Sequence, residues 1–333
     1  MISLIYPPSG AVIDTHTDIQ NKFIDFIKTQ GISAALEWLL PQKDGSELSF
    51  PNSVRFEWSD TNAREYIFEI SEDKDFTTSY TSRTEAPFFV MTNLKIGQKY
   101  YWRINGGIYD TFETLDNKFR FLKIDGALNV RDIGGINIKQ GLLYRGSEIN
   151  KEYQITEIGK KVFKEQLYIK TELNLRKESE SADGISCVGG GVRYKYLPYR
   201  PYVEMFRDEH RKGIVKIMDF FADSENYPIY FHCLGGADRT GMIAFLLRAL
   251  LGEHDEDILI DYELTSLSSY AYGLAEGVTA LGFRSREADY FQEFISLFNA
   301  YNGNSYCEKA ESFLLECNVK PSTIARIRSI LKK

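Results

Sequence analysis

The chain has 333 residues, of which 43% are hydrophobic and 14% aromatic, so it can form two domains with separate cores and is not a disordered protein. Its formal net charge of −7 argues against nucleic acid or an anionic membrane as the main partner. No run of 18 or more apolar residues occurs, so we expect no integral membrane segment, and no signal peptide is visible.

Short segments with alternating apolar and polar residues occupy the first third of the chain. They are rich in aromatic and β-branched residues and are separated by Asp, Asn, Gly and Lys, which is typical of strands joined by turns. Strands at this density predict an all-β sandwich over residues 1–117. The predicted strands are residues 3–6, 54–58, 65–70, 88–91 and 100–104.

This region contains Trp58, a predicted strand after it and a Tyr-x-Trp pattern that ends at Trp102. In these features it resembles a fibronectin type III or immunoglobulin-like module. The resemblance implies a module that docks a protein or a glycan, although core packing also explains its aromatic residues. Residues 18–40 depart from this module, because their apolar side chains have helical spacing. We therefore expect one or two helices inserted between the first two strands of this domain.

Strand and helix patterns alternate over residues 118–333, the predicted second domain. This order predicts an α/β domain with a mostly parallel central sheet, covered on both faces, and a site at the carboxyl ends of its strands. Extra helices follow, and Tyr262, Tyr270 and Tyr272 could line a cap over the site. The predicted strands are residues 169–175, 192–197 and 229–232, and the predicted helices include 155–167, 210–222 and 242–251.

Residues 233–239 hold the chemistry of the chain, between an apolar strand and an apolar helix. Gly235 and Gly236 allow backbone N–H groups to turn inward, which at a helix N-terminus forms a cradle for an anion. Such surroundings lower the pKa of a cysteine thiol, so we expect Cys233 to be a thiolate. Arg239 offers a planar fork for two phosphoryl oxygens. We interpret the pair as a nucleophile and a phosphate clamp.

The segment HCLGGADRTG, residues 232–241, resembles the signature of the cysteine-dependent protein tyrosine phosphatases, in the bacterial and fungal branch of the family 3 type. Residues 129–135 (NVRDIGG) and 143–147 (LYRGS) resemble two further motifs of this branch, and Asp261-Tyr262 resembles a third. The resemblance covers about two thirds of the chain. It implies a protein tyrosine phosphatase with a cysteinyl-phosphate intermediate and with no metal or other cofactor.

The resemblance also assigns residues to the site. His232, Arg131 and Asp132 would support the loop, with His232 in a structural role because neighbours on a strand point to opposite faces. Thr240 would donate its hydroxyl to the thiolate and ease its departure. The phosphate-binding residues would be Leu234, Gly235, Gly236, Ala237, Asp238, Arg239 and Thr240.

The general acid is the uncertain member of the site. Many phosphatases of this superfamily carry it as an Asp on a mobile loop before the catalytic strand, but here residues 198–204 read PYRPYVE and contain no Asp. Asp238, inside the catalytic loop, is the first candidate and Asp132 the second. Glu204 and Asp208 are more remote candidates.

Three functions stay open at this point. Phosphotyrosine is favoured as substrate, in a protein or a small phosphomonoester, because Ala237 stands where relatives that act on phosphoinositides often have a Lys. Lys195 and Arg200 keep phosphoinositides or inositol phosphates as an alternative. The second alternative is a non-catalytic adaptor that binds phosphate groups.

The sequence does not fix a compartment. Sandwich modules joined to hydrolases favour an exported, periplasmic or cell-surface protein, whereas a catalytic cysteine that must stay reduced favours the cytoplasm. Cysteines stand at positions 187, 233, 307 and 317 and show no metal-binding spacing.

Overall fold

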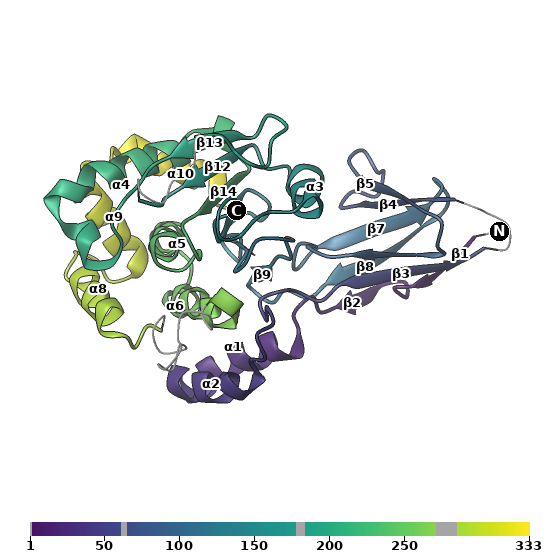
Figure 1. Cartoon of the computed structure of the whole chain (residues 1–333), viewed down its shortest axis with the longest axis horizontal. Coiled ribbons are helices and arrows are strands. Elements are labelled where there is room, and N and C mark those ends of the chain that lie inside the picture. Colours follow the sequence, from purple (N-terminus) through teal and green to yellow (C-terminus); the bar gives the residue numbers. More distant parts are fainter. Residues whose placement is uncertain (1, 61–64, 178–183, 271–284) are drawn as a thin grey trace. The chain divides into compact units, whose positions relative to one another are not determined.

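The computed structural model describes residues 2–60, 65–177, 184–270 and 285–333 (Figure 1). The contacts within the chain divide it into two compact units. Unit 1 comprises Met1–Thr17 and Phe50–Lys123, and unit 2 comprises Asp18–Ser49 and Ile124–Lys333. The chain therefore passes between the units three times.

Unit 1 is built from two β-sheets. One has the order β1-β3-β6, with antiparallel pairs, and the other has the order β2-β8-β7-β4-β5, in which β2 pairs with β8 in parallel. The strands are β1 (Ser3–Tyr6), β2 (Ala11–Ile13), β3 (Val54–Ser59), β4 (Tyr66–Ser71), β5 (Tyr80–Thr84), β6 (Phe88–Met91), β7 (Lys99–Ile104) and β8 (Tyr109–Thr114). A short strand, β9 (Arg120–Phe121), follows near the end of the unit.

Aromatic side chains from both sheets form the core of unit 1. The alternation of β3 turns Val54, Phe56 and Trp58 inward. The ring of Phe56 lies 4.8 Å from that of Phe68 on β4 and 5.3 Å from that of Trp102 on β7, measured between centroids. The predicted all-β character is confirmed, and these aromatic residues pack in the core. The likeness to a fibronectin or immunoglobulin module stays a prediction.

Unit 2 has a mixed sheet with the order β13-β12-β14-β11-β10. The central strand β14 (Ile229–His232) pairs in parallel with β11 (Leu143–Gly146) and β12 (Thr171–Asn174), and β12 pairs in parallel with β13 (Arg193–Tyr196). β10 (Arg131–Asp132) is antiparallel to β11. The expected α/β domain is confirmed, with an antiparallel strand beside the parallel ones.

Helices surround this sheet, as Figure 1 shows. α5 (Asp238–Leu250) follows the central strand, and every residue from Thr240 to Leu250 is buried. The other helices are α3 (Glu157–Glu165), α4 (Asp208–Phe221), α6 (Asp255–Glu263), α8 (Asp289–Asn299), α9 (Tyr306–Glu316) and α10 (Pro321–Leu331). Single 3-10 turns lie at η3 (Tyr202–Phe206), η4 (Ser224–Asn226) and η5 (Leu264–Leu267).

The inserted helices are α1 (Asp18–Gln30) and α2 (Ile32–Leu39), followed by the 3-10 turn η1 (Leu40–Gln42). Their positions in the chain match the prediction, but their contacts place them with unit 2 rather than with the β domain that they interrupt. For example, the Leu48 N–H donates to the Leu267 carbonyl at 3.1 Å. Such contacts join residues more than 200 positions apart, so local sequence patterns do not reveal them.

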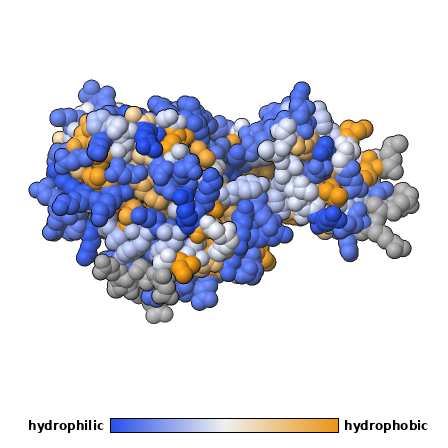
Figure 2. Space-filling view, turned by 90° about the horizontal axis from the view of Figure 1, so that it is seen from above, coloured by the Kyte–Doolittle hydropathy of each residue, from blue (hydrophilic) through white to orange (hydrophobic). Residues whose placement is uncertain are grey.

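The exposed surface and the lengths of the helices were also compared with what the composition predicts. The face shown in Figure 2 is mainly hydrophilic, with hydrophobic residues in small, scattered groups. Within the described ranges, no helix combines the length and the apolar character needed to span a membrane.

Candidate active site

Cys233 lies where the central strand of unit 2 ends. β14 is buried along its whole length because the sheet is covered on both faces, and the side chain of Cys233 is itself buried. The loop of residues 233–237 then leads directly into α5. The cysteine is thus placed at the carboxyl edge of the parallel strands and at the N-terminus of a buried helix, as the sequence predicted.

Both glycines of this loop are required by close packing. Gly236 has a φ of +69°, and a Cβ there would lie 2.4 Å from the carbonyl group of Gly146 at the end of β11. A Cβ on Gly235 would lie 2.1 Å from ring atoms of Tyr270. The backbone of the loop is therefore held between β11 and Tyr270, in a conformation that L side chains rarely adopt at position 236.

Four consecutive carbonyl groups of the loop are bound from outside it. In a planar trans peptide the N–H of one residue points opposite to the C=O of the residue before it. The N–H groups of residues 234–237 are therefore directed toward the inside of the loop. The outer contacts are His232 Nδ1 to Cys233 O (3.1 Å), Glu148 N–H to Leu234 O (2.8 Å), Asn129 Nδ2 to Gly235 O (3.0 Å) and Arg145 Nη2 to Gly236 O (2.8 Å).

Arg131 and Arg145, which lie at the outer face of the loop, share a carboxylate partner, Asp261 of α6. Arg145 donates to the carboxylate at 2.6 Å, and Arg131 donates to it at 3.3 Å and also binds the Asn129 side chain. Arg248 lies 3.7 Å from the same carboxylate. All these side chains are buried. The two sequence motifs that contain Asn129 and Arg145 thus meet at the outer face of the loop.

The pKa values of Asp261 and Arg131 are both lowered in this cluster, for different physical reasons. Burial would raise the pKa of Asp261, but the guanidinium groups around it, with Arg145 first, hold that pKa well below its usual range. Burial and, after it, the charge of Arg145 lower the pKa of Arg131 to about 9, although Asp261 acts in the opposite direction. Asp261 is therefore ionised, and positive charge exceeds its single negative charge directly behind the loop.

His232 lies behind the loop on β14. Its Nε2 is 3.0 Å from the carboxylate of Glu172 on β12, and both side chains are buried. This geometry supports a structural role for His232, because the ring is engaged on the neighbouring strand.

Asp238 begins α5 and is held by tyrosines. The Tyr202 hydroxyl donates to Asp238 Oδ1 at 2.6 Å and lies 2.8 Å from the Tyr262 hydroxyl. Tyr199 donates its hydroxyl to the carbonyl oxygen of Arg239. Tyr199 and Tyr202 come from the segment in which many related phosphatases carry their acid, so this segment provides tyrosines that hold the catalytic loop.

Asp132 binds a different turn. Its carboxylate accepts hydrogen bonds from the N–H groups of Gly134 and Gly141, both at 2.7 Å, and so closes the connection between β10 and β11. Glu204 forms an ion pair with Arg207, and Asp208 forms one with Arg211. The identity of the general acid stays a prediction, with Asp238 as the first candidate.

Arg239 and Thr240 lie in the first turn of α5. Arg239 is half-buried and Thr240 is fully buried. The Thr240 hydroxyl makes no hydrogen bond within the described part of the chain, and its donation to the thiolate stays a prediction. Of the three tyrosines predicted to cap the site, Tyr262 and Tyr270 lie beside the loop and its helix, and Tyr272 lies outside the described residues.

Several supporting residues were not assigned a role from the sequence. Tyr199 and Tyr202 belong to no recognised motif, and Arg145 and Asp261 were recognised only as parts of motifs. The signal for Arg145 was a charged residue within a short, buried strand, which requires a partner. Asp261 gave no such signal, because its helix contains four other acidic residues.

Among the described residues, one group of side chains has the spacing of a metal site: Glu204, Glu209 and His210. His210 Nε2 lies 3.5 Å from each carboxylate, and Glu209 is exposed, so ordinary ion pairing accounts for the group. It contributes no side chain to the catalytic loop.

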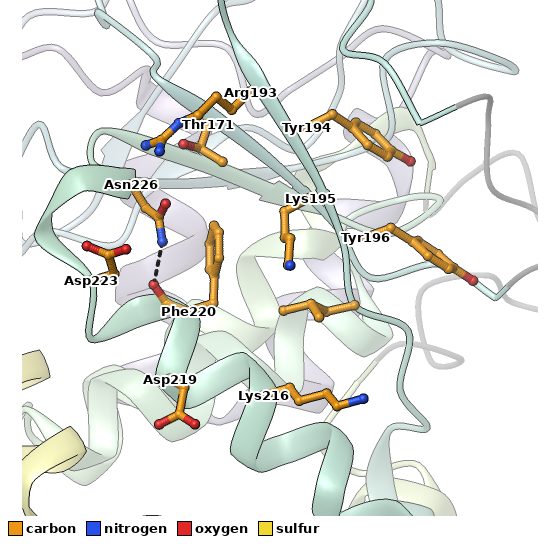
Figure 3. Close-up of a pocket in the computed structure, with 11 residues that line it drawn as sticks. Thr171, Arg193, Tyr194, Lys195, Tyr196, Lys216, Asp219, Phe220, Asp223 and Asn226 are labelled. Carbon is orange, nitrogen blue, oxygen red and sulfur yellow. Dashed lines mark hydrogen bonds between the residues drawn. The ribbon is translucent and has the colours of Figure 1, made fainter.

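A cavity of about 750 Å³ lies between β13 and α4 (Figure 3). Lys195 and Phe220 point into it, and Thr171 and Asn226 lie at its wall. The cavity is lined by the beginning of β12, by the whole of β13 and by α4, and its lining includes no residue of the loop 233–239. It is therefore separate from the catalytic loop.

Comparison with known proteins shows the family of the chain. Residues 122–333 match the model of the tyrosine phosphatase family, so the chain belongs to this family and is a phosphatase. The core catalytic domain of the PP-IP phosphatase Siw14 from S. cerevisiae matches 49% of this chain and 93% of its own, with 19% identity and a TM-score of 0.32. A second structure of the Siw14 catalytic core matches 49% and 92%, with 17% identity and a TM-score of 0.31. The curated proteins contain no match.

Proposed function

We propose that this chain is a protein tyrosine phosphatase that acts through a cysteinyl-phosphate intermediate on Cys233. The observation that carries the proposal is the set of four carbonyl groups bound from outside the loop, because the N–H groups of residues 234–237 then face the inside of the loop. Inward N–H groups at a helix N-terminus stabilise both a thiolate and the equatorial oxygens of a phosphoryl group.

The reaction has two steps. In the first, the Cys233 thiolate attacks phosphorus, an S–P bond forms and the bond to the leaving oxygen breaks. In the second, a water oxygen attacks phosphorus, the S–P bond breaks and phosphate leaves with the thiolate restored. Arg239 binds two phosphoryl oxygens in both steps, and Thr240 donates to the departing thiolate.

Asp238 is the proposed proton donor of the first step and acceptor of the second. Tyr202 fixes one oxygen of its carboxylate, which orients the group at the N-terminus of α5. Burial raises the pKa of Tyr202 well above its usual value, so the phenol stays a hydrogen-bond donor throughout the neutral range.

Phosphotyrosine is favoured by the surroundings of the loop. Ala237 is buried and brings no cation for a second phosphate. Tyr270 lies against Gly235, and the ring centroids of Tyr270 and Tyr153 are 6.4 Å apart. Aromatic side chains therefore flank the loop. Lys195, which could have served a polyphosphate, lies in the cavity between β13 and α4 instead.

The test is phosphate release at about pH 6 with reductant and EDTA, for wild type and Cys233→Ser. The substrates are a phosphotyrosine peptide, a phosphoserine peptide, a phosphoinositide and inositol hexakisphosphate. Cys307→Ser is the matched control, because Cys307 is half-buried on α9 and binds the Leu250 carbonyl.

We expect release from phosphotyrosine that Cys233→Ser abolishes and Cys307→Ser preserves. Preference for either inositol compound would replace the proposed substrate class. No release from any of the four would favour a phosphate-binding adaptor, with unit 1 as its docking module.

A further inference from the structure

The segment Asp18–Ser49, called here the helical arm, lies outside the family match yet belongs to the catalytic unit. We propose that the helical arm is a positioning element, which holds Tyr270 against the catalytic loop and so keeps the loop in its anion-binding shape. The consequences for turnover rest on the proposed function, whereas the consequences for the loop do not.

The arm binds residues 267–269 through Lys43, Glu47 and Leu48, which follow its last turn, η1. Glu47 Oε2 accepts hydrogen bonds from the Ser269 N–H (2.8 Å), the Ser269 hydroxyl (2.8 Å) and the Ser268 hydroxyl (3.0 Å). The Lys43 ammonium donates to the Ser268 carbonyl at 2.8 Å. One carboxylate thus gathers three donors, and a buried ammonium fixes the adjacent peptide.

Lys43 is held in this position by its surroundings. Burial lowers its pKa to about 8, and the charge of Glu47 acts in the opposite direction. The backbone adds one more contact, from the Leu48 N–H to the Leu267 carbonyl. The arm therefore fixes residues 267–269 by charge, by side-chain hydrogen bonds and by the main chain.

Tyr270 follows residues 267–269 in the chain and contacts the catalytic loop. Its N–H donates to the Ser268 hydroxyl at 3.3 Å, and its side chain is buried. The ring lies so close to Gly235 that a Cβ there would come within 2.1 Å of it. Asn129 binds the Gly235 carbonyl at 3.0 Å, so this peptide is held both by the ring and by the Asn129 amide.

A shift of residues 268–270 would therefore change the loop. If the ring moved away, the peptide that joins Gly235 to Gly236 could rotate, and the Gly236 N–H would turn away from the inside of the loop. The thiolate is the reactive form of cysteine, and inward N–H groups stabilise it. With fewer of these N–H groups, Cys233 should therefore react more slowly with an alkylating agent at a given pH.

The experiment measures alkylation of Cys233 by iodoacetamide between pH 5 and 9 in the full chain, with the modified peptide quantified by mass spectrometry. The variants are Glu47→Ala and Tyr270→Ala. Glu37→Ala is the matched control, since Glu37 is an exposed carboxylate on α2 of the same arm. The thermal midpoint and the kcat and KM for a phosphotyrosine peptide are recorded for each protein.

We expect Glu47→Ala and Tyr270→Ala to move the alkylation profile about one pH unit upward, which is about a tenfold lower rate at pH 6. We expect kcat to fall in both variants. Tyr270→Phe should keep most of the wild-type alkylation rate and kcat, because the proposal depends on the aromatic ring and not on the hydroxyl. Glu37→Ala should retain the wild-type profile.

Unchanged alkylation profiles in folded Glu47→Ala and Tyr270→Ala proteins would overturn the proposal, even if both were less stable. If Glu47→Ala does not fold, Tyr270→Ala decides alone. If the wild type hydrolyses no phosphate ester, the proposed function fails, while the alkylation profiles still decide whether the arm positions the loop.

Discussion

At the scale of single residues, Arg145 joins two parts of the site that are distant in sequence. One of its nitrogens binds the Asp261 carboxylate and another binds the Gly236 carbonyl. A guanidinium group can make both contacts because its donors diverge in a fixed plane, which an ammonium group cannot reproduce. The loop conformation therefore depends on a side chain that does not reach the substrate.

We expect Arg145→Met to harm turnover more than stability. Removing one partner of a buried ion pair costs about 3 to 5 kcal/mol in general, but here Arg131 and Arg248 remain beside Asp261, so we expect about 1 to 3 kcal/mol. The freed Gly236 peptide should lower kcat about 100-fold, the effect of losing one oxyanion-binding donor. Urea unfolding and single-substrate kinetics measure both effects.

Arg83→Met serves as the control for this change, because Arg83 is an exposed arginine paired with Glu65 in unit 1. If the kcat of Arg145→Met declined only as far as the folded fraction does, the loop would not depend on Arg145.

Tyr202 and Asp238 form a second pair whose roles can be separated. Asp238→Asn should slow substrates with poor leaving groups and spare those with good ones, because only the former need the proton. Tyr202→Phe removes the hydroxyl that orients the carboxylate, so we expect the same leaving-group dependence with a smaller loss, about tenfold. The measurement compares a phosphotyrosine peptide with p-nitrophenyl phosphate.

The double variant decides whether the two residues act as one unit. If Tyr202 acts through Asp238, adding Tyr202→Phe to Asp238→Asn should cause little further loss. Fully additive losses would separate their roles, and a rate unaffected by Asp238→Asn would remove Asp238 from the acid role. Tyr168→Phe, at an exposed tyrosine, is the control.

At the scale of elements, α6 ends in a buried carboxylate. Glu263 Oε1 accepts hydrogen bonds from the Arg286 N–H at 2.6 Å and the Ser285 hydroxyl at 3.3 Å. It thereby ties the end of α6 to the residues just before α8. Burial raises the pKa of Glu263 to about 8, although Arg286 acts in the opposite direction. The group is therefore mostly protonated in the folded chain below that pH.

This shift predicts how stability depends on pH. Between the ordinary value of 4.5 and about 8 the native state holds a proton that the unfolded state has lost, so the free energy of unfolding falls as pH rises through this window. Glu263→Gln, which is neutral at every pH, should therefore stabilise the protein more at pH 8 than at pH 5, by about 3 to 4 kcal/mol. Urea unfolding at both values measures the difference.

Glu256→Gln is the matched control, since Glu256 is an exposed carboxylate in the first turn of the same helix. Equal effects of Glu263→Gln at the two pH values would show that the carboxyl group is already ionised in the folded state.

Elements that depend on local pattern were predicted well from the sequence. Residues 229–232 form a strand because their apolar run is short and bounded by a turn, and the glycines and the following apolar run predict the loop and α5. The same holds for α4, where the helix begins two residues earlier than predicted. The cysteine and its loop follow from these elements because the sequence places them at their junction.

Local sequence patterns could not predict the contacts that complete the site. The carboxylate of Asp261 binds Arg145 across 116 positions, and Tyr202 binds Asp238 across 36. Each is decided by how the elements pack, and neither partner has a spacing that indicates the other. The helical arm shows the same limit, because its helices were predicted but its place in unit 2 was not.

At the scale of the whole molecule, the division of the chain has a practical consequence. The sequence suggests a catalytic domain that begins at residue 118, but the contacts of unit 2 include residues 18–49. A fragment of residues 118–333 would keep Tyr270 and lose Lys43, Glu47 and Leu48, which fix the residues before it. Cutting the chain between its two halves thus removes part of the second unit.

We expect residues 118–333 alone to be less stable and less active than a fusion that joins residues 18–49 to 124–333 through a long Gly-Ser linker. Each lost kcal/mol lowers the Tm of a domain of this size by about 2 to 4 °C, so the loss of several buried hydrogen bonds should be visible in a thermal scan. The fusion should also retain the kcat of the full chain, because it keeps the arm residues that bind residues 267–269. Equal Tm and kcat for the two fragments would mean that the arm is a passive insertion, and a loss of kcat in both would assign the missing contribution to unit 1.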